Sequence, residues 1–301
     1  MIDFAGRVAV VTGAGGGLGR AYSMLLAERG AAVVVNDLGG SVRGEGASLS
    51  AADDVVAEIR AAGGTAVAEY SSVATPEGGA AIVQRAIDEF DRIDILISNA
   101  GILRDRTLAN MELEDLSSVL DVHLLGGFFV AKPAFLSMRE QGYGRILFAS
   151  SGSGLFGNFG QSNYGAAKTG LIGLMNVLKL EGAKHGITVN AIAPIARTRM
   201  TQELLGDMSE AFSPESVAPA VAYLVSEGCE LTGEIWSVGG GSVSRVFIGL
   251  TDGYFKHPDR AGAITIEDVA DHVADVRADD GFIVPFSARD EFAKLGPRLF
   301  T

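Results

Sequence analysis

The chain alternates between short apolar segments and longer segments with the apolar spacing of helices. The short segments are rich in β-branched residues and do not alternate strictly with polar ones, which is typical of strands buried on both faces. The predicted strands cover Val8–Val11, Val33–Asn36, Thr65–Ala68, Ile93–Ile97, Arg145–Ala149, Ile187–Ile192 and Glu234–Val238. Helical patterns fill the gaps between them.

Seven strands that alternate with helices predict a parallel sheet between two helix layers. Right-handed crossovers then give a doubly wound α/β fold of the Rossmann type. The residues at the predicted helix ends agree with this fold. Ser213-Pro214 places an N-cap before a proline, and Gly63-Gly64 ends the helix before the third strand. The loop from Leu38 to Gly46 is longer than usual for a strand-to-helix connection, and it lies at the end of the sheet where ligands bind.

The pattern changes after Gly239-Gly240-Gly241. We therefore assign residues 1–241 to one α/β domain and residues 242–301 to a C-terminal helical extension. A helix is predicted over Ile266–Arg277 with a Thr265-x-x-Asp268 cap, and a second short helix is predicted from Ser287. Because this extension is too small for a substantial core, we expect it to pack on the same domain or on a neighbouring subunit.

Composition narrows the class of protein. Apolar residues make up 48% of the chain and charged residues 20%, which is typical of a globular protein. The net charge of −13 argues against binding to nucleic acid or to acidic membranes. No apolar run approaches the roughly 18 residues of a spanning helix, and the N-terminus does not resemble a signal peptide. The single cysteine, Cys229, fits a reducing compartment, so we expect a cytoplasmic protein.

A glycine-rich turn, Thr12–Gly19, follows the first strand and opens the first helix. Glycine lets the backbone approach a pyrophosphate, while the helix N-terminus presents free amide donors. Asp37 ends the second strand, where a carboxylate accepts both ribose hydroxyls and repels a 2′-phosphate, which favours NAD over NADP. Asn99-Ala100-Gly101 closes the fourth strand in the same row. The alternatives are a loop-edge carboxylate at Asp37 and an ordinary turn at Asn99–Gly101.

Ser151, Tyr164 and Lys168 predict a proton-transfer site for a secondary alcohol. Tyr164 and Lys168 are four positions apart and share one face of a helix. An ammonium group this close to a phenol is expected to lower the pKa of the tyrosine from about 10 toward working pH. The Ser151 hydroxyl would orient an alcohol or carbonyl against Tyr164. The same Tyr-x-x-x-Lys spacing also occurs in ordinary surface packing.

The ordered set of the glycine turn, Asn99–Gly101, Ser151, Tyr164-x-x-x-Lys168 and Pro194 resembles the short-chain dehydrogenase/reductase family over residues 4–241. The resemblance implies that Tyr164 is the general acid/base, that Lys168 binds the nicotinamide ribose and that Ser151 orients the substrate oxygen. The cofactor-binding residues that it implies are Gly13, Gly17, Leu18, Gly19, Asp37, Ser72, Val73, Asn99, Ala100, Gly101, Tyr164, Lys168 and Pro194. No metal ligand is implied.

Four further segments are similar to the (3R)-hydroxyacyl-CoA dehydrogenase unit of multifunctional enzyme type 2 and its bacterial stand-alone relatives: 36–40, 99–106, 157–161 and 199–201. This resemblance implies NAD-dependent oxidation of a (3R)-3-hydroxyacyl-CoA, with a fatty or steroid side chain, by a homodimer or homotetramer. The alternatives are an NADPH-dependent 3-oxoacyl thioester reductase and a 17β-hydroxysteroid dehydrogenase. A non-catalytic NAD-binding protein is disfavoured because the catalytic trio is intact.

The chain departs from the wider family at two places. His123 stands where an asparagine usually completes a water relay to the lysine, so it either holds the same water or packs in its helix. Ser71-Ser72-Val73 replaces an aspartate that often reads adenine. Residues that either line an acyl groove or belong to the core are Leu155, Phe156, Phe159, Met200, Leu204 and Leu205. Residues that either bind CoA phosphates or are simply solvated are Arg104, Arg106, Arg197 and Arg199.

Overall fold

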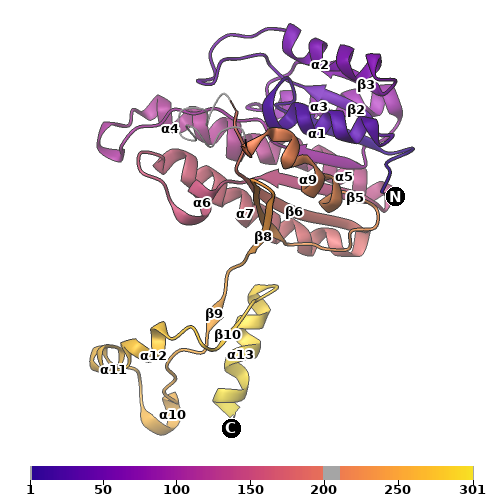
Figure 1. Ribbon diagram of the computed structural model, residues 1–301. Coiled ribbons are helices and arrows are strands. Elements are labelled where there is room, and N and C mark those ends of the chain that lie inside the picture. The colour runs from indigo at the N-terminus through magenta and orange to yellow at the C-terminus, as the bar shows by residue number, and fades with distance from the viewer. Residues whose placement is uncertain (1, 199–210, 301) are drawn as a thin grey trace. The chain divides into compact units, whose positions relative to one another are not determined.

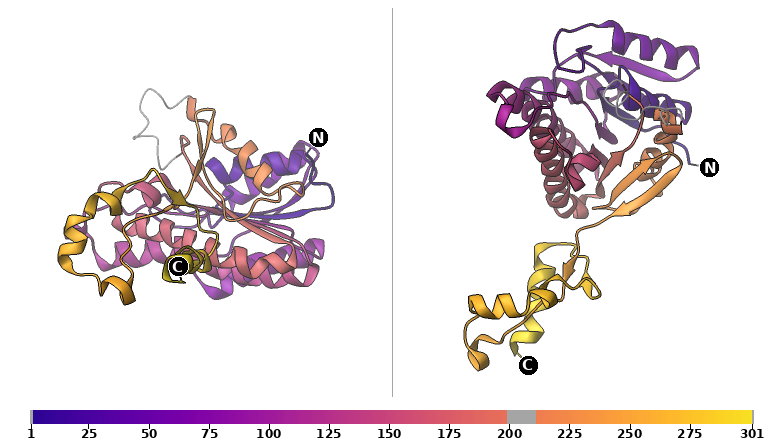
Figure 2. Two further views of the ribbon diagram at one scale, coloured as in Figure 1. Left: turned by 90° about the horizontal axis from the view of Figure 1, so that it is seen from below. Right: turned by 60° about the vertical axis from the view of Figure 1, so that its left-hand side comes forward.

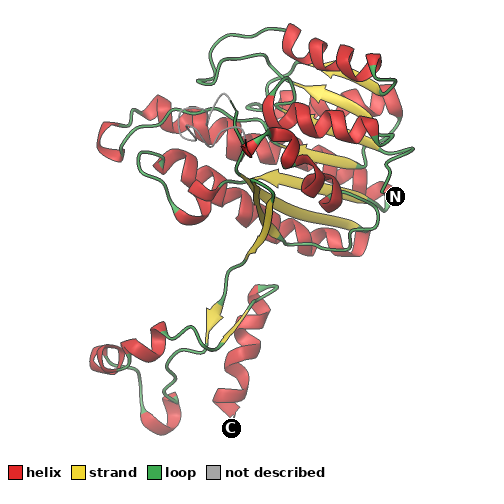
Figure 3. Ribbon diagram, viewed as in Figure 1, coloured by secondary structure: helices red, strands yellow, loops and turns green. Residues whose placement is uncertain are grey.

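A sheet of eight strands lies between two layers of helices in the computed structural model, which describes residues 2–198 and 211–300 (Figures 1 and 3). The strand order is β3-β2-β1-β4-β5-β6-β7-β8. The bounds are β1 (Val8–Thr12), β2 (Ala32–Asn36), β3 (Thr65–Glu69), β4 (Ile95–Ser98), β5 (Gly144–Ala149), β6 (Ile187–Pro194), β7 (Ile235–Gly239) and β8 (Ser242–Val246). The order reverses between β1 and β4, so the predicted doubly wound fold is confirmed.

The first seven strands are parallel, as the sequence predicts. Val10 of β1, for example, pairs with Val34 on one side and Leu96 on the other. All five residues of β1 are buried, which explains why this strand is a continuous apolar run.

The sheet has one strand more than the seven predicted. β8 follows β7 after only Gly240 and Gly241, which both have positive φ values of 56° and 77°. A two-residue connection with positive φ at both positions is typical of a β-hairpin, whose strands are antiparallel, because parallel strands need a much longer crossover. The glycines that we interpreted as the end of the domain are therefore the turn of this hairpin.

The two helix layers cover opposite faces of the sheet (Figure 2). One layer contains α1 (Gly17–Glu28), α2 (Ser50–Ala61) and α9 (Ala218–Leu224). The other contains α3 (Pro76–Phe90), α5 (Gly126–Gln141) and α7 (Ser162–Gly182). Shorter helical segments are η1 (Leu108–Asn110), α4 (Leu113–Leu120), η2 (Asp121–Leu125), α6 (Gly152–Phe156), η3 (Ala183–His185) and η5 (Pro214–Ser216).

The helical run α4–η2–α5 is continuous from Leu113 to Gln141. Its length and composition alone would allow it to cross a membrane, whereas the apolar pattern predicted no spanning segment. In this fold the run contacts α3, α7 and β5, and it carries the buried His123. These contacts are those of a core helix of an α/β protein. Within it, η2 is a π-helical turn, a distortion that is frequent at functional sites.

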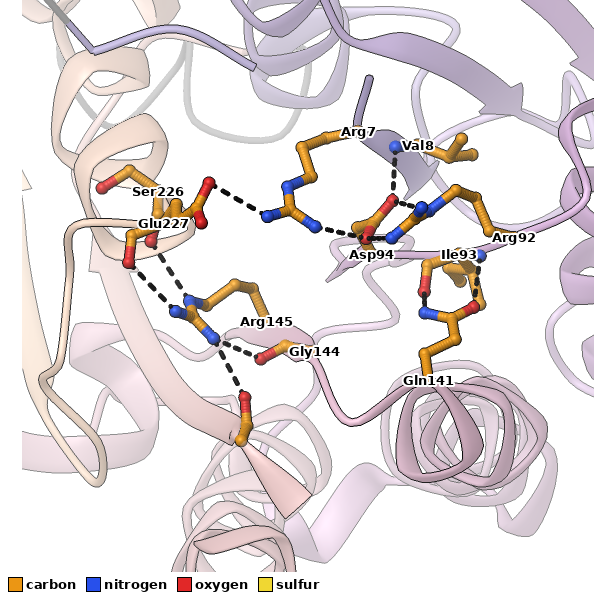
Figure 4. A network of polar contacts seen from close by, with 11 residues as sticks. Arg7, Val8, Arg92, Ile93, Asp94, Gln141, Gly144, Arg145, Ser226 and Glu227 are labelled. Carbon is orange, nitrogen blue, oxygen red and sulfur yellow. Dashed lines mark hydrogen bonds and ion pairs between the residues drawn. The ribbon is translucent and has the colours of Figure 1, made fainter. Parts of the chain in front are cut away.

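Polar side chains gather where β1, β4 and β5 begin (Figure 4). Asp94, which is fully buried, accepts hydrogen bonds from the Val8 amide and from the guanidinium groups of Arg7 and Arg92. The nearby Arg145 guanidinium donates to the carbonyls of residues 144, 186, 226 and 227. These contacts tie the segment after α9 to the start of the sheet, opposite the strand ends that carry the predicted site.

Residues 246–301 form a second compact unit. It contains β9 (Leu250–Thr251), α10 (Pro258–Ala261), α11 (Ile266–Asp271), α12 (Val273–Arg277), β10 (Phe282–Ile283) and α13 (Ala288–Phe300). The predicted capping box is present, since Thr265 Oγ1 accepts from the Asp268 amide at 3.1 Å and Asp268 Oδ2 accepts from the Thr265 amide at 2.9 Å. The helix predicted over Ile266–Arg277 is interrupted at His272, whose ring stacks on Tyr254.

Candidate active site

A cavity of about 500 Å³ lies along the carboxyl ends of the parallel strands. Its walls include the turns that follow β1, β2, β3, β4, β5 and β6, together with the start of α7. The predicted site residues that line it are Gly13, Gly17, Leu18, Asp37, Ser72, Val73, Asn99, Ala100, Gly101, His123, Ser151, Tyr164, Lys168 and Pro194. Of the predicted set, only Gly19 lies outside this lining.

The glycine turn is packed closely against the end of β4. A Cβ atom on Gly13 would lie 2.7 Å from the Ala100 Cα, and one on Gly19 would collide with the Gly13 carbonyl. Asn99 holds this arrangement, because its Nδ2 donates to the carbonyls of Thr12 and Gly13 at 3.0 and 3.2 Å. The lack of a side chain at Gly19 therefore allows the turn to pack closely on itself, while Gly13 and Gly17 leave the backbone accessible to a pyrophosphate.

Asp37 faces the glycine turn from the end of β2. Its Oδ2 accepts from the Gly15 amide at 2.8 Å and its Oδ1 accepts from the Gly39 amide at 2.7 Å. Each carboxylate oxygen keeps a further lone pair for a ribose hydroxyl. Among the described lining residues the only cationic side chains are Arg104 and Lys168. Arg104 donates to Glu114 at 2.8 Å and to the Arg43 carbonyl at 3.1 Å. This electrostatic environment fits a cofactor without a 2′-phosphate.

The end of β3 forms another part of the wall. The Glu69 carboxylate accepts from Asn36 Nδ2 at 2.6 Å and from the Ser71 amide at 2.9 Å, so it holds the ends of β2 and β3 together. Ser72 and Val73 line the cavity, as the resemblance implies. A serine hydroxyl at this position replaces the carboxylate that is frequent in the family.

The long loop after Asp37 lines the cavity through Leu38, Gly40, Ser41, Val42 and Gly44. The Leu103 amide donates to the Val42 carbonyl at 2.9 Å, which joins this loop to the segment that follows Asn99–Gly101. The loop therefore lies at the edge of the sheet where the sequence placed it, along the wall of the cavity.

Ser151 and Tyr164 come together in the wall of the cavity. Ser151 Oγ accepts from the Ser153 amide at 3.1 Å, which leaves its own proton free to donate. Burial raises the pKa of Tyr164, and the hydrogen bond to Ser151 opposes this rise, as expected for a donor that favours the phenolate. The Tyr164 ring meets the His123 ring edge-on, with the two centroids 5.0 Å apart.

The expected lowering of the pKa of Tyr164 by Lys168 does not appear in this geometry, because burial has the largest effect on this pKa. Lys168 Nζ donates to the Ala149 carbonyl at 2.5 Å and lies 5.5 Å from the centroid of the Tyr164 ring. Burial raises the pKa of Tyr164 to about 12, with a smaller contribution from Asp105, and burial also lowers the pKa of Lys168 to about 7. Because both groups are desolvated, each is driven toward its neutral form.

His123 is buried and contacts the backbone of Ile102. Its Nε2 lies 3.0 Å from the Ile102 nitrogen and 2.8 Å from the Ile102 oxygen, while its Nδ1 has no hydrogen-bond partner in the described part of the chain. Burial and the charge of Lys168 lower its pKa well below the ordinary value of a histidine. The imidazole is therefore neutral at pH 7, and a role in a water relay remains a hypothesis.

The residues suggested for an acyl groove and for CoA phosphates have different surroundings. Leu155, Phe156 and Phe159 are absent from the cavity lining, and Phe156 and Phe159 are largely exposed. Arg106 pairs with Asp115 at 2.8 Å, and Arg104 pairs with Glu114, so neither is simply solvated. Arg197 is exposed. Arg199, Met200, Leu204 and Leu205 lie outside the described residues.

Sequence reasoning gave no role to three polar residues around the start of α7. Asn158 and Gln161 line the cavity and hydrogen-bond to each other, and Asn163 is buried directly before Tyr164. Asn158 and Gln161 lie in the segment 157–161 that carries the resemblance, whereas only its proximity to Tyr164 in the sequence points to Asn163.

The burial of Lys168 predicts a pH-dependent stability. Its pKa falls from 10.5 unfolded to about 7 folded, so between these values the unfolded chain binds more protons. Its contribution to the free energy of unfolding must therefore rise with pH through this window, and the cost of a buried ammonium is fully present below pH 7. Relative to wild type, Lys168→Met should be most stabilised at about pH 6 and less so at about pH 9.5 in urea denaturation. The exposed Lys132→Met is the control, and a Lys168→Met difference independent of pH would contradict the burial of a titrating amine.

The chain is similar over most of its length to several known proteins. The family model for short chain dehydrogenase matches residues 7–208. A protein named as a short-chain type dehydrogenase/reductase in Mycobacterium tuberculosis is 54% identical over 272 residues, which are 90% of this chain and 93% of that protein. Peroxisomal multifunctional enzyme type 2 of Mus musculus is 53% identical over 246 residues, or 81% of this chain and 33% of the mouse protein.

The solved structure of full-length peroxisomal multifunctional enzyme type 2 from Drosophila melanogaster has a TM-score of 0.83 and 40% identity, and it covers 99% of this chain and 50% of the fly chain. This chain thus spans only part of the multifunctional relatives. At lower identity, a 3-oxoacyl-[acyl-carrier-protein] reductase of Synechocystis is 40% identical, and a hydroxyacyl-CoA dehydrogenase of Mycobacterium tuberculosis is 38% identical.

Proposed function

This chain belongs to the short-chain dehydrogenase/reductase family, and on that basis we propose that it uses NAD to oxidise a (3R)-3-hydroxyacyl-CoA to the 3-ketone. Family membership makes it an oxidoreductase that acts on CH–OH groups. The observation that carries the finer proposal is the convergence of Ser151, Tyr164 and Lys168 with Asp37 around one cavity. The finer proposal includes the substrate and the cofactor.

Ser151 and Tyr164 divide the work on the substrate oxygen. In the proposed oxidation Ser151 donates a hydrogen bond to the alcohol oxygen, and Tyr164 Oη removes its proton. Bound NAD would accept the hydride that leaves the carbon bearing the alcohol oxygen. With its pKa raised to about 12, Tyr164 is protonated at neutral pH in the described geometry, which is the form that donates to a carbonyl in the reverse reaction. A positive charge on Lys168 would favour the phenolate needed for oxidation.

Relatives of different specificity support the substrate class and define the main alternative. A hydroxyacyl-CoA dehydrogenase and a 3-oxoacyl-[acyl-carrier-protein] reductase both act, by name, on acyl thioesters that carry an oxygen on the acyl chain. We favour the first because Asp37 disfavours NADP. An NADPH-dependent 3-oxoacyl thioester reductase and a 17β-hydroxysteroid dehydrogenase remain the alternatives.

The test is a kinetic comparison of (3R)- and (3S)-3-hydroxyacyl-CoAs of several chain lengths, including a steroid side-chain thioester, beside a 17β-hydroxysteroid. Each substrate is assayed with NAD and with NADP. Turnover of the (3R) thioesters with NAD is expected. Activity confined to NADPH and 3-oxoacyl carrier-protein thioesters, or to the hydroxysteroid, would replace the proposal with the corresponding alternative.

Asp37 provides a prediction about the cofactor. Replacing it by serine removes a charged acceptor for two ribose hydroxyls, and a hydrogen bond to a charged group contributes about 1.5–3 kcal/mol. We therefore expect Asp37→Ser to lower kcat/KM for NAD by roughly 10- to 100-fold and to raise that for NADP. Asp54→Ala, an exposed change on α2, is the control. A wild-type protein that prefers NADP would overturn this interpretation of Asp37.

We extend the proposal to the assembly and the C-terminal unit. Every described residue of 246–300 is at least partly exposed within the chain, so this unit has no core of its own. Its apolar side chains, including Phe282 and Phe292, therefore favour packing on the sheet domain or on a neighbouring subunit of a homodimer or homotetramer. Light scattering of the full chain and of residues 1–245 tests the subunit alternative.

The cytoplasmic location expected from the sequence is also part of the proposal.

A further inference from the structure

A buried amide side chain links the first turn of α7 to two distant segments. Asn163 is 1% exposed and directly precedes Tyr164. Its Nδ2 donates to the Arg104 carbonyl at 3.0 Å and to the Asp115 carbonyl at 2.9 Å. Its Oδ1 accepts from the Tyr164 amide at 2.8 Å. The two N–H groups and the carbonyl of this side chain are thus all engaged, as a buried amide requires.

These bonds act where the helix by itself is weakest. The first amides of a helix have no intrahelical acceptor, and Tyr164 lies in the first turn of α7. Asn163 supplies the acceptor for the Tyr164 amide. Through its two donors it also fixes this turn to α4 and to the segment that follows Asn99–Gly101, which lines the cofactor cavity.

A second set of contacts joins the same segments beside Asn163. Gln161 Nε2 donates to Asp105 at 2.6 Å, and the Arg106 amide donates to the Gly160 carbonyl at 2.8 Å. Arg106 Nε lies 2.8 Å from a carboxylate oxygen of the nearly buried Asp115. Because several polar groups hold the segments in one register, the loss of Asn163 would loosen the start of α7 without separating these segments completely.

We propose that Asn163 is a positioning residue that fixes the Tyr164 phenol against Ser151. This inference rests on the proposed function, in which that phenol transfers the proton. The hydroxyl is at the far end of the Tyr164 side chain, so a small rotation of the helix start moves it by more than it moves the backbone. A misplacement of about 1 Å costs an enzyme about 100-fold in rate.

The experiment compares Asn163→Ser with Asn190→Ser. Serine at 163 is too short to reach both carbonyls. Asn190 is an equally buried amide on β6, which donates to the Leu231 carbonyl and accepts from the Glu234 amide, so its loss reports a general effect on stability. We expect Asn163→Ser to lower kcat by roughly 10- to 100-fold while the KM for the alcohol and the Kd for NAD change by less than about threefold. In the pH profile of oxidation, the acid limb of Asn163→Ser should lie at higher pH than that of wild type, because Tyr164 loses the hydrogen bond with Ser151 that lowers its pKa.

Hydrogen exchange provides a readout that needs no substrate. The amides of residues 162–168 should exchange faster in Asn163→Ser than in wild type, and they should be unchanged in Asn190→Ser. If Asn163→Ser does not fold, Asn163→Asp, which has the same shape and retains an acceptor, takes its place. Unchanged kcat and pH profile, or equal losses in both variants at equal Tm, would overturn the proposal. A wild-type protein that does not oxidise 3-hydroxyacyl-CoA would instead contradict the proposed function, while the exchange comparison would still test the bonds of Asn163.

Discussion

We expect Tyr164→Phe to lower kcat for alcohol oxidation by about 10²- to 10⁴-fold, the usual contribution of general acid/base catalysis. The substitution removes one oxygen atom and leaves the ring that packs edge-on against His123. Cofactor binding should be retained, because the glycine turn, Asp37 and Lys168 are unchanged. Steady-state kinetics and a fluorescence titration with NAD measure the two effects separately.

Tyr70→Phe is the matched control. Tyr70 also uses its hydroxyl in a hydrogen bond, to Asp53 at 2.7 Å, but it does not line the active-site cavity. Its substitution should leave kcat within about twofold of wild type, as expected for a surface change. Activity retained in Tyr164→Phe would exclude proton transfer by this phenol and with it the proposed mechanism.

The second large effect is expected on stability, from Asp94→Ala at the opposite end of the sheet. Asp94 is fully buried and balances the charge of Arg7 and Arg92 (Figure 4). Removing one partner of a buried ion pair costs about 3–5 kcal/mol, and here the side chains of Arg7 and Arg92, which are 20% and 40% exposed, lose the buried carboxylate that pairs with both. The Val8 amide also loses its acceptor. For a domain of this size the loss corresponds to a fall in Tm of roughly 6–20 °C by calorimetry.

Glu227→Ala tests whether burial is the cause of this effect. Glu227 pairs with the same Arg7 at 2.9 Å, but 73% of its side chain is exposed. An exposed pair contributes about 0–1 kcal/mol, so this variant should unfold close to wild type. Equal losses in the two variants would show that the charge of Arg7, and not the burial of Asp94, decides the stability.

The order of strands and helices could be predicted from the sequence because its signals are local. Runs such as Val8–Val11 are apolar without alternation only when both faces of a strand are covered. The position of Asp37 in the cavity followed from the same reasoning, since parallel strands end at one edge, whereas Tyr164 was predicted from its spacing to Lys168. The β7–β8 hairpin could not be separated from a domain boundary, because glycines serve both.

What a side chain does at its position depended on its neighbours in space. Spacing alone placed Lys168 beside Tyr164. In the folded chain burial raises the pKa of the Tyr164 phenol, and Lys168 Nζ donates a hydrogen bond to the Ala149 carbonyl. Likewise, Arg106 forms an ion pair with Asp115, and Asn163 donates to the carbonyls of Arg104 and Asp115, which are far from it in the sequence. The sequence by itself determined the fold and the family and predicted Ser151, Tyr164 and Lys168 as catalytic residues, because these inferences depend on periodicity and spacing. Only the tertiary structure decided the protonation states and the positioning contacts, because desolvation and hydrogen bonding depend on which groups the fold brings together.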